Sequence, residues 1–211
     1  SMKKRIVSAL VLAGMIASTS AFASNARELV MGTGGASNYS AGGSFYYEDA
    51  YNIFYNPAYV NDYKNWAIFE KGTGNDAASF GFVSSMMNYN LGLFFNRNDA
   101  LKTGTNAVDL TFGGDMGVKW GLGLTYGSRK LADNGSQDNL DVRVGVSMMG
   151  LDPFVHFQAI GKDKANGADT NKYEGFGGGL RYHYGEWTPY ASINTAKKTD
   201  VVANTNVKTT T

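Results

Sequence analysis

From residue 66 to residue 196, large apolar residues alternate again and again with small or polar residues. The alternation is clearest over 118–127, where every second residue is apolar: Val118, Trp120, Leu122, Leu124 and Tyr126. Successive side chains of a β-strand point to opposite faces, so this period of two predicts strands with two unlike faces. About nine such strands can be counted, and amphipathic-helix patterns are scarce. The sequence therefore predicts an all-β protein.

The residues between the apolar positions indicate whether the apolar face of the sheet lies in the interior or on the exterior of the protein. They are mostly glycine, small polar residues and scattered charges; the chain has 27 glycines, no cysteine and only 18% charged residues. A soluble β-sandwich buries its apolar face and exposes a densely polar one. A polar interior with a large apolar exterior is typical of outer-membrane barrels instead. We therefore predict an antiparallel up-and-down transmembrane β-barrel over residues 63–211.

The expected connections between the strands alternate in length, which also favours a barrel. Four are short, at 85–88, 114–117, 149–152 and 185–186, and three are longer and hydrophilic, at 97–106, 131–139 and 161–172. Outer-membrane barrels place short turns on the periplasmic side and long loops outside. Residues 197–211 read as one more outer loop. Because nine strands leave one edge unpaired, we expect further strands to follow in the natural gene product.

The first 23 residues have the pattern of a secretory signal peptide. Residues 3–5 are basic, 6–17 are apolar, and 18–23 end in a small-x-small cleavage pattern after Ala23. The chain has 19 basic and 18 acidic residues, and cleavage removes three of the basic ones. The slightly acidic mature chain lacks the basic balance of a nucleic-acid-binding protein. The expected location is the Gram-negative outer membrane, after cleavage near Ala23.

Residues 24–62 do not alternate, and they contain a distinctive segment at 48–60. Its acidic-Ala pair, followed by an aromatic residue and Asn-Pro-Ala just before the first expected strand, resembles the long-chain-fatty-acid channel family and the related PorV-type barrels. In those families this segment folds into the barrel mouth as part of an N-terminal hatch. The resemblance implies that Asn56, Pro57 and Ala58 are hatch residues. Pro57 is expected to stop regular strand pairing and Asn56 to bond local backbone, and Phe54 and Tyr55 can pack against the inner wall of the barrel.

Two further sets of residues follow from the predicted barrel. Aromatic residues near strand ends are expected at the two membrane interfaces: Trp120, Tyr126, Tyr182, Tyr184 and Trp187. Charged and histidine residues at inward positions are expected to line the lumen and set its selectivity: Asp109, Lys119, Arg129, Arg143, His156, Arg181 and His183.

A polar lumen predicts a porin-like channel for passive passage of small hydrophilic solutes. Two alternatives stay open: uptake of hydrophobic compounds gated by the N-terminal segment, as in the fatty-acid channels, and a non-conducting structural or adhesive barrel. The expected partners are outer-membrane lipid, small solutes and the barrel-assembly machinery, with a homo-oligomer as a further option.

Enzymatic chemistry is not expected. Ser147 has no motif that would supply a base and an orienting group, and the two histidines, His156 and His183, lack a third ligand at metal-binding spacing. Both histidines fall at inward positions, which makes them lumen-lining residues, and adjacent strands at equal height could bring them near one another. No catalytic residue, metal site or cofactor is predicted.

Overall fold

The computed structural model describes residues 45, 48, 50–70, 79–96, 106–132, 134–202 and 205–210. The predicted signal peptide, 1–23, lies outside the described residues, as does most of the predicted hatch before residue 50. No helix of the described part is long and apolar enough to cross a bilayer.

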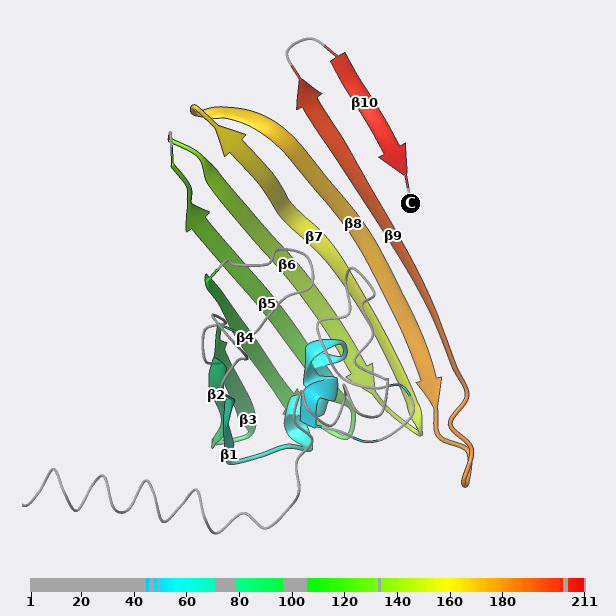
Figure 1. Ribbon diagram of the computed structural model, residues 1–211. Coiled ribbons are helices and arrows are strands. Elements are labelled where there is room, and N and C mark those ends of the chain that lie inside the picture. The colour runs from blue at the N-terminus through cyan, green and yellow to red at the C-terminus, as the bar shows by residue number, and fades with distance from the viewer. Residues whose placement is uncertain are drawn as a thin grey trace, which may run out of the picture.

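The described strands form one antiparallel sheet in which each strand pairs with its neighbours in sequence (Figure 1). The strands are β1 (Trp66–Glu70), β2 (Ser79–Met86), β3 (Tyr89–Phe95), β4 (Asn106–Asp115), β5 (Lys119–Lys130), β6 (Ser136–Ser147), β7 (Leu151–Ala165), β8 (Ala168–Tyr182), β9 (Tyr190–Val202) and β10 (Thr205–Thr210). The predicted all-β, up-and-down organisation is thus confirmed, and β1–β9 correspond to the nine predicted strands. Among the described strands the sheet is open, with β1 and β10 at its edges.

Two of the expected outer loops are strands instead. The predicted loop at 161–172 is the end of a β7–β8 hairpin, whose turn is Asn166-Gly167 with φ of 50° and 78°. Positive φ at both central residues is the geometry that two-residue hairpin turns prefer and that Asn-Gly supplies. The predicted loop at 197–211 contains the end of β9 and all of β10. Both predictions were wrong because a hydrophilic, charged segment can still form a strand: backbone pairing continues through these residues.

The two faces of the sheet differ as predicted. The inner face is the one covered by the two short helices described below, and the outer face is the opposite one. Apolar side chains on the outer face are exposed, for example Leu122 at 47% and Phe176 at 52% of their full area. Inward positions on the same strands are buried and small or polar, as at Gly121, Thr125 and Arg181. A bulge between β6 and β7, next to Leu140, shifts the register once without exchanging these faces.

Two short 3₁₀ helices, η1 (Ala50–Phe54) and η2 (Pro57–Asn61), lie against the inner face, near the end of the sheet where the short turns are (Figure 1). The main cluster of buried apolar residues joins these helices to the sheet, with Ile53, Phe54 and Val60 from the helices and Phe94 and Phe154 from the strands. The residues of η1 and η2, with the flanking residues Phe45, Glu48, Tyr55, Asn56 and Asp62, are called the hatch below.

Candidate functional site

The turn from η1 to η2 is built by Asn56 and Pro57. Asn56 caps η2: its Oδ1 accepts the N–H of Ala58 at 3.0 Å, and Pro57 occupies the first helical position, where no N–H is needed. The amide Nδ2 of Asn56 also donates to the carbonyl of Val146 on β6 at 3.3 Å. The same side chain therefore shapes the hatch and attaches it to the sheet.

Aromatic rings of the hatch fill the inner face of the sheet. Phe54 meets Phe94 of β3 edge to face, with ring centroids 4.9 Å apart, and Tyr55 lies 5.1 Å from Phe154 of β7. Phe54 and Tyr55 are only 1% and 4% exposed. The packing predicted for these two residues is therefore present.

Inward-facing glycines make this close approach possible. A Cβ atom added to Gly121 would lie 2.2 Å from the carbonyl oxygen of Pro57, and one added to Gly145 would lie 1.8 Å from Oδ1 of Asn56. Such separations are far below van der Waals contact. At these two positions of β5 and β6, a larger residue would collide with the hatch, which explains part of the glycine content of the inner face.

Arg143 on β6 is the first of two arginines that hold the hatch. Its guanidinium donates to the carbonyl oxygen of Phe54 at 2.6 Å, to the Asp109 carboxylate at 3.0 Å and to the Thr125 hydroxyl at 2.7 Å. The Thr125 hydroxyl in turn donates to Asp109. Arg143 and Asp109 are 1% and 0% exposed, so this is a buried ion pair shared between the sheet and the hatch backbone.

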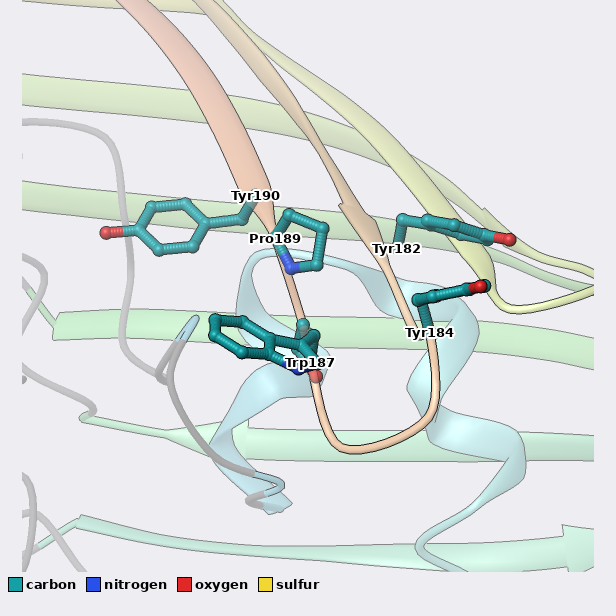
Figure 2. A pocket seen from close by; sticks show the side chains of 6 residues that line it. Tyr182, Tyr184, Trp187, Pro189 and Tyr190 are labelled. Atoms are coloured by element: carbon teal, nitrogen blue, oxygen red, sulfur yellow. The ribbon is translucent and has the colours of Figure 1, made fainter.

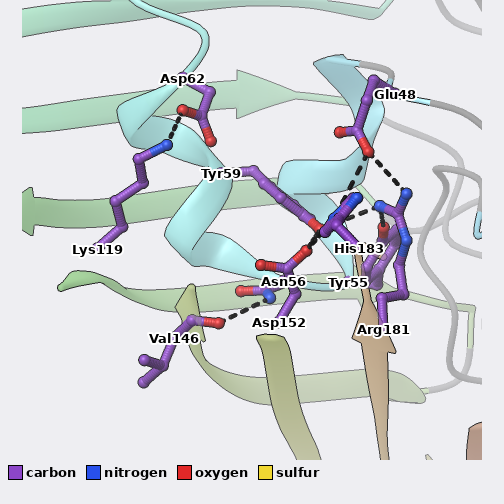
Figure 3. A network of polar contacts seen from close by, with 10 residues as sticks. All are labelled: Glu48, Tyr55, Asn56, Tyr59, Asp62, Lys119, Val146, Asp152, Arg181 and His183. Carbon is purple, nitrogen blue, oxygen red and sulfur yellow. Dashed lines mark hydrogen bonds and ion pairs between the residues drawn. The ribbon is translucent and has the colours of Figure 1, made fainter. Parts of the chain in front are cut away.

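Arg181 on β8 is the second arginine that holds the hatch, and it binds hatch side chains (Figure 3). Its Nη1 donates to the Tyr55 hydroxyl at 2.8 Å and to the Tyr59 hydroxyl at 3.0 Å. Its Nη2 forms an ion pair with Glu48 at 2.7 Å. Since Arg181 is 1% exposed, the hatch supplies the partners that a buried guanidinium requires.

Asp152 on β7 extends this network toward the short turns (Figure 3). It accepts the Tyr59 hydroxyl proton at 2.5 Å and lies 2.6 Å from Nε2 of His183. Burial raises the pKa of the Tyr55 and Tyr59 phenols above the ordinary value, and for Tyr59 the hydrogen bond to Asp152 adds to this. Both phenols are therefore neutral donors and acceptors over the physiological pH range.

Polar contacts also fasten the end of η2. Asn61 donates to the carbonyl of Trp120 on β5 at 3.1 Å and accepts from Asn90 on β3 at 2.8 Å. Beside it, Lys119 forms a partly exposed ion pair with Asp62. The hatch is thus held by β3 and by β5 through β8.

Five of the seven predicted lumen residues belong to the polar contacts that hold the hatch. They are Asp109, Lys119, Arg143, Arg181 and His183. His156 pairs with Asn194 of β9 at 3.0 Å and sits opposite Gly177, about 20 Å along β8 from His183. The expectation that the two histidines meet was therefore wrong. Arg129 is exposed near the far end of β5. No three His, Asp or Glu residues of the described chain cluster as metal ligands would.

The predicted interfacial aromatics gather near the short turns, with the exception of Tyr126, which is 51% exposed farther along β5. Trp120 packs edge to face against Phe112 at 5.6 Å. Tyr182 and Tyr184 stack at 6.1 Å, and together with Trp187 they line an open pocket at the β8–β9 connection (Figure 2). The pocket also includes Thr188, Pro189 and Tyr190.

Sequence reasoning missed several members of the site, above all Glu48, Tyr59, Asp152 and Thr125. Glu48 and Tyr59 fall inside the segment 48–60, and Asp152 lies directly opposite Arg181 in the β7–β8 ladder. An inward carboxylate beside an inward arginine was a readable signal. The contacts with the hatch could not be predicted from the sequence, because they join residues about 90 to 130 positions apart.

No protein-family model, curated protein or solved structure matches this chain. The resemblance of residues 48–60 to the fatty-acid channels and PorV-type barrels therefore stays a prediction, and the site's geometry is the ground for a functional proposal.

Proposed function

We propose that the sheet is the wall of an outer-membrane β-barrel that forms a channel for small hydrophilic solutes, with the hatch bound inside as its restriction. The observation that carries the proposal is the contrast between the faces: exposed apolar side chains outside, and polar side chains inside that hydrogen-bond to the hatch. This is the inverse of a soluble sheet and the usual arrangement of a membrane barrel.

The outer face supports contact with lipid. Leu110, Leu122, Val144, Val155 and Phe157, from four adjacent strands, are each 36–47% exposed. A continuous apolar patch of this kind is rare on soluble monomers and marks a surface covered by lipid or protein. In lipid, every backbone N–H and C=O needs a partner, so the proposal requires the edges β1 and β10 to be paired in the membrane.

The inner face supports a hydrophilic lumen with a bound hatch. Arg143 and Arg181 donate to the hatch and are buried, so we propose that they anchor it and do not act as selectivity charges. Solute passage then depends on whether the hatch shifts or leaves a path beside it. The partly exposed Lys119–Asp62 pair is the contact most easily opened, since surface ion pairs contribute little.

A reversible cross-link tests this function. The chain has no cysteine, so Asp62→Cys/Lys119→Cys provides a single thiol pair between the hatch and β5. Single-channel conductance in planar bilayers is measured with the pair joined by a short bifunctional thiol reagent containing a disulfide, and again after reduction. We expect conductance to fall on joining and to recover on reduction. Conductance that is absent in both states would favour a non-conducting barrel, and a constant conductance would show that the hatch is not the restriction.

Uptake of hydrophobic compounds is the second candidate, favoured by the aromatic pocket at the β8–β9 connection (Figure 2). A labelled fatty acid would be expected to bind there, and Trp187→Ala would weaken the binding, because Trp187 is 77% exposed at the pocket. Binding that does not change in this variant would remove the pocket as support.

A further inference from the structure

The outward face of the sheet changes character at the end far from the short turns. On β5 to β9 the apolar outward positions give way to five lysines, called the lysine row here: Lys130, Lys162, Lys164, Lys172 and Lys197. Their outward direction follows from the register, in which Lys162 lies opposite Asp138 and Lys172 and Lys197 lies opposite Glu174. Four of the five, all except Lys130, lie in strand ends that the sequence predicts as loops.

The lysine row lies at the height expected for a membrane surface. Lys172 is ten residues from Tyr182 on β8, and Lys130 is ten residues from Trp120 on β5. Ten residues of strand span about 33 Å, or about 25 Å across a membrane at a tilt of about 40°, which equals the usual height of the lipid-facing band. The interfacial aromatics and the lysine row therefore bound the apolar band on its two sides.

The row carries more positive than negative charge. Among the described residues, three acidic ones are close to it: Glu174 pairs with Lys197 at 2.7 Å, Asp169 lies 3.7 Å from Lys172, and Asp138 is opposite Lys162. Lys162 and Lys172 nevertheless stand directly opposite one another on neighbouring strands. Like charges directly opposite one another on neighbouring strands are unfavourable, so this pair is a place where a further anion would be favoured.

We infer that the lysine row binds the phosphate groups of lipid headgroups in the leaflet at that end of the barrel. The inference rests on the proposed function, since it requires the apolar band to be embedded in lipid. Ammonium groups next to an apolar band meet anionic headgroups at the depth where the acyl chains begin. The ligand class is therefore a phosphate-bearing lipid, and the contact is a lateral one on the outer wall.

Spin-labelled lipids test the inference in the membrane-inserted protein. The full chain is reconstituted in phosphatidylcholine vesicles containing trace spin-labelled phosphatidic acid or spin-labelled phosphatidylcholine, and the motionally restricted fraction of each is measured. We expect a preference of about fivefold or more for phosphatidic acid, falling toward none in Lys162→Gln/Lys172→Gln and weakened by added salt. Lys198→Gln is the matched control, because Lys198 points inward and pairs with Asp200 at 2.8 Å.

The outcomes separate the two proposals. Equal restriction of both lipids by the wild-type protein would overturn the lysine row as a phosphate site while leaving the lipid-facing wall intact. A preference that persists in the double variant would also overturn it. Absence of any restricted lipid would overturn the proposed membrane function, and the lysine row with it.

Discussion

The two faces of β6 show how differently one strand can be stabilised on its two sides. Inward, Asp141 and Arg143 are 2% and 1% exposed, whereas outward, Val144 remains 36% exposed. The inner face is completed by the chain itself: Arg143 donates to the hatch backbone at Phe54 and to the Asp109 carboxylate of β4. The outer face is not completed by any described part of the chain. The inner face therefore depends on the hatch, whereas the exposed apolar side chains of the outer face support the proposed contact with lipid.

The largest effect is expected when a buried charge on the inner face loses its partner. Arg143→Met leaves the Asp109 carboxylate, which is fully buried, without its cation. Removal of one partner of a buried pair costs about 3–5 kcal/mol. The free energy of unfolding, measured by denaturant titration of the protein in detergent micelles, is expected to fall by about this amount.

The double variant Arg143→Met/Asp109→Leu is the control, because it removes both charges. Replacement of a whole buried pair by apolar residues is often nearly neutral, so most of the lost stability should return. A single variant that loses less than about 1 kcal/mol would contradict the structural role given to this pair.

The next effect belongs to the outer face. Leu124→Arg places a charge near the middle of the proposed lipid-facing band, at a side chain that is 41% exposed, and is expected to cost about 2–4 kcal/mol when the protein is folded in a bilayer. Ser128→Arg, on the same strand and face but near the edge of the band next to Lys130, should cost about 1 kcal/mol or less. Equal and small effects at both positions would indicate an outer face in water, where surface substitutions are mild.

A smaller effect tests the fit between the hatch and the glycines. Gly145→Ala adds a methyl group at the site of Asn56 Oδ1 and is expected to cost about 1–3 kcal/mol by overpacking. Asn56→Gly in the same chain makes room for the methyl group, and glycine is an acceptable helix cap. Thermal unfolding should therefore show the double variant to be more stable than Gly145→Ala. The reverse order would mean that the hatch does not lie against Gly145.

The smallest effect is a loss of stability at high pH, caused by ionisation of buried tyrosines of the hatch. The pKa of Tyr55 and of Tyr59 is raised by burial, so the folded state holds these protons more tightly than the unfolded chain does. Their contribution to stability is complete below pH ~10, the ordinary pKa of tyrosine, and is lost as the pH rises above it. Tyrosinate absorbance should show two phenols that ionise only when the hatch is released. In Tyr55→Phe/Tyr59→Phe the delayed phase should lose the amplitude of two phenols; an unchanged amplitude would assign it to other tyrosines, such as Tyr173, whose pKa is also raised by burial.

The sequence predicted the strands and their faces because the period-two pattern depends only on neighbouring residues. It predicted β5 from Trp120 to Tyr126 and the inward direction of Arg143 and Arg181 in this way. It did not reveal what these arginines bind, because their partners Phe54 and Glu48 are brought to them only by the fold. The extension of β7 and β8 was missed although Asn166-Gly167 is a strong hairpin signal, since the charges around it suggested a loop.

The central claim is that one face of the sheet meets lipid and the other meets the hatch, and spin labels on single cysteines test it most directly. The labels are placed at Leu122→Cys, Val144→Cys and Val155→Cys, with Ser128→Cys as the reference at the edge of the band next to Lys130, in a chain that has no other cysteine. In bilayers, collisions with oxygen, which concentrates in lipid, are compared with collisions with a water-soluble nickel chelate. We predict that the first three labels collide mainly with oxygen and that the label at residue 128 is accessible to the chelate. Labels at 122, 144 and 155 that collide freely with the chelate would contradict the claim.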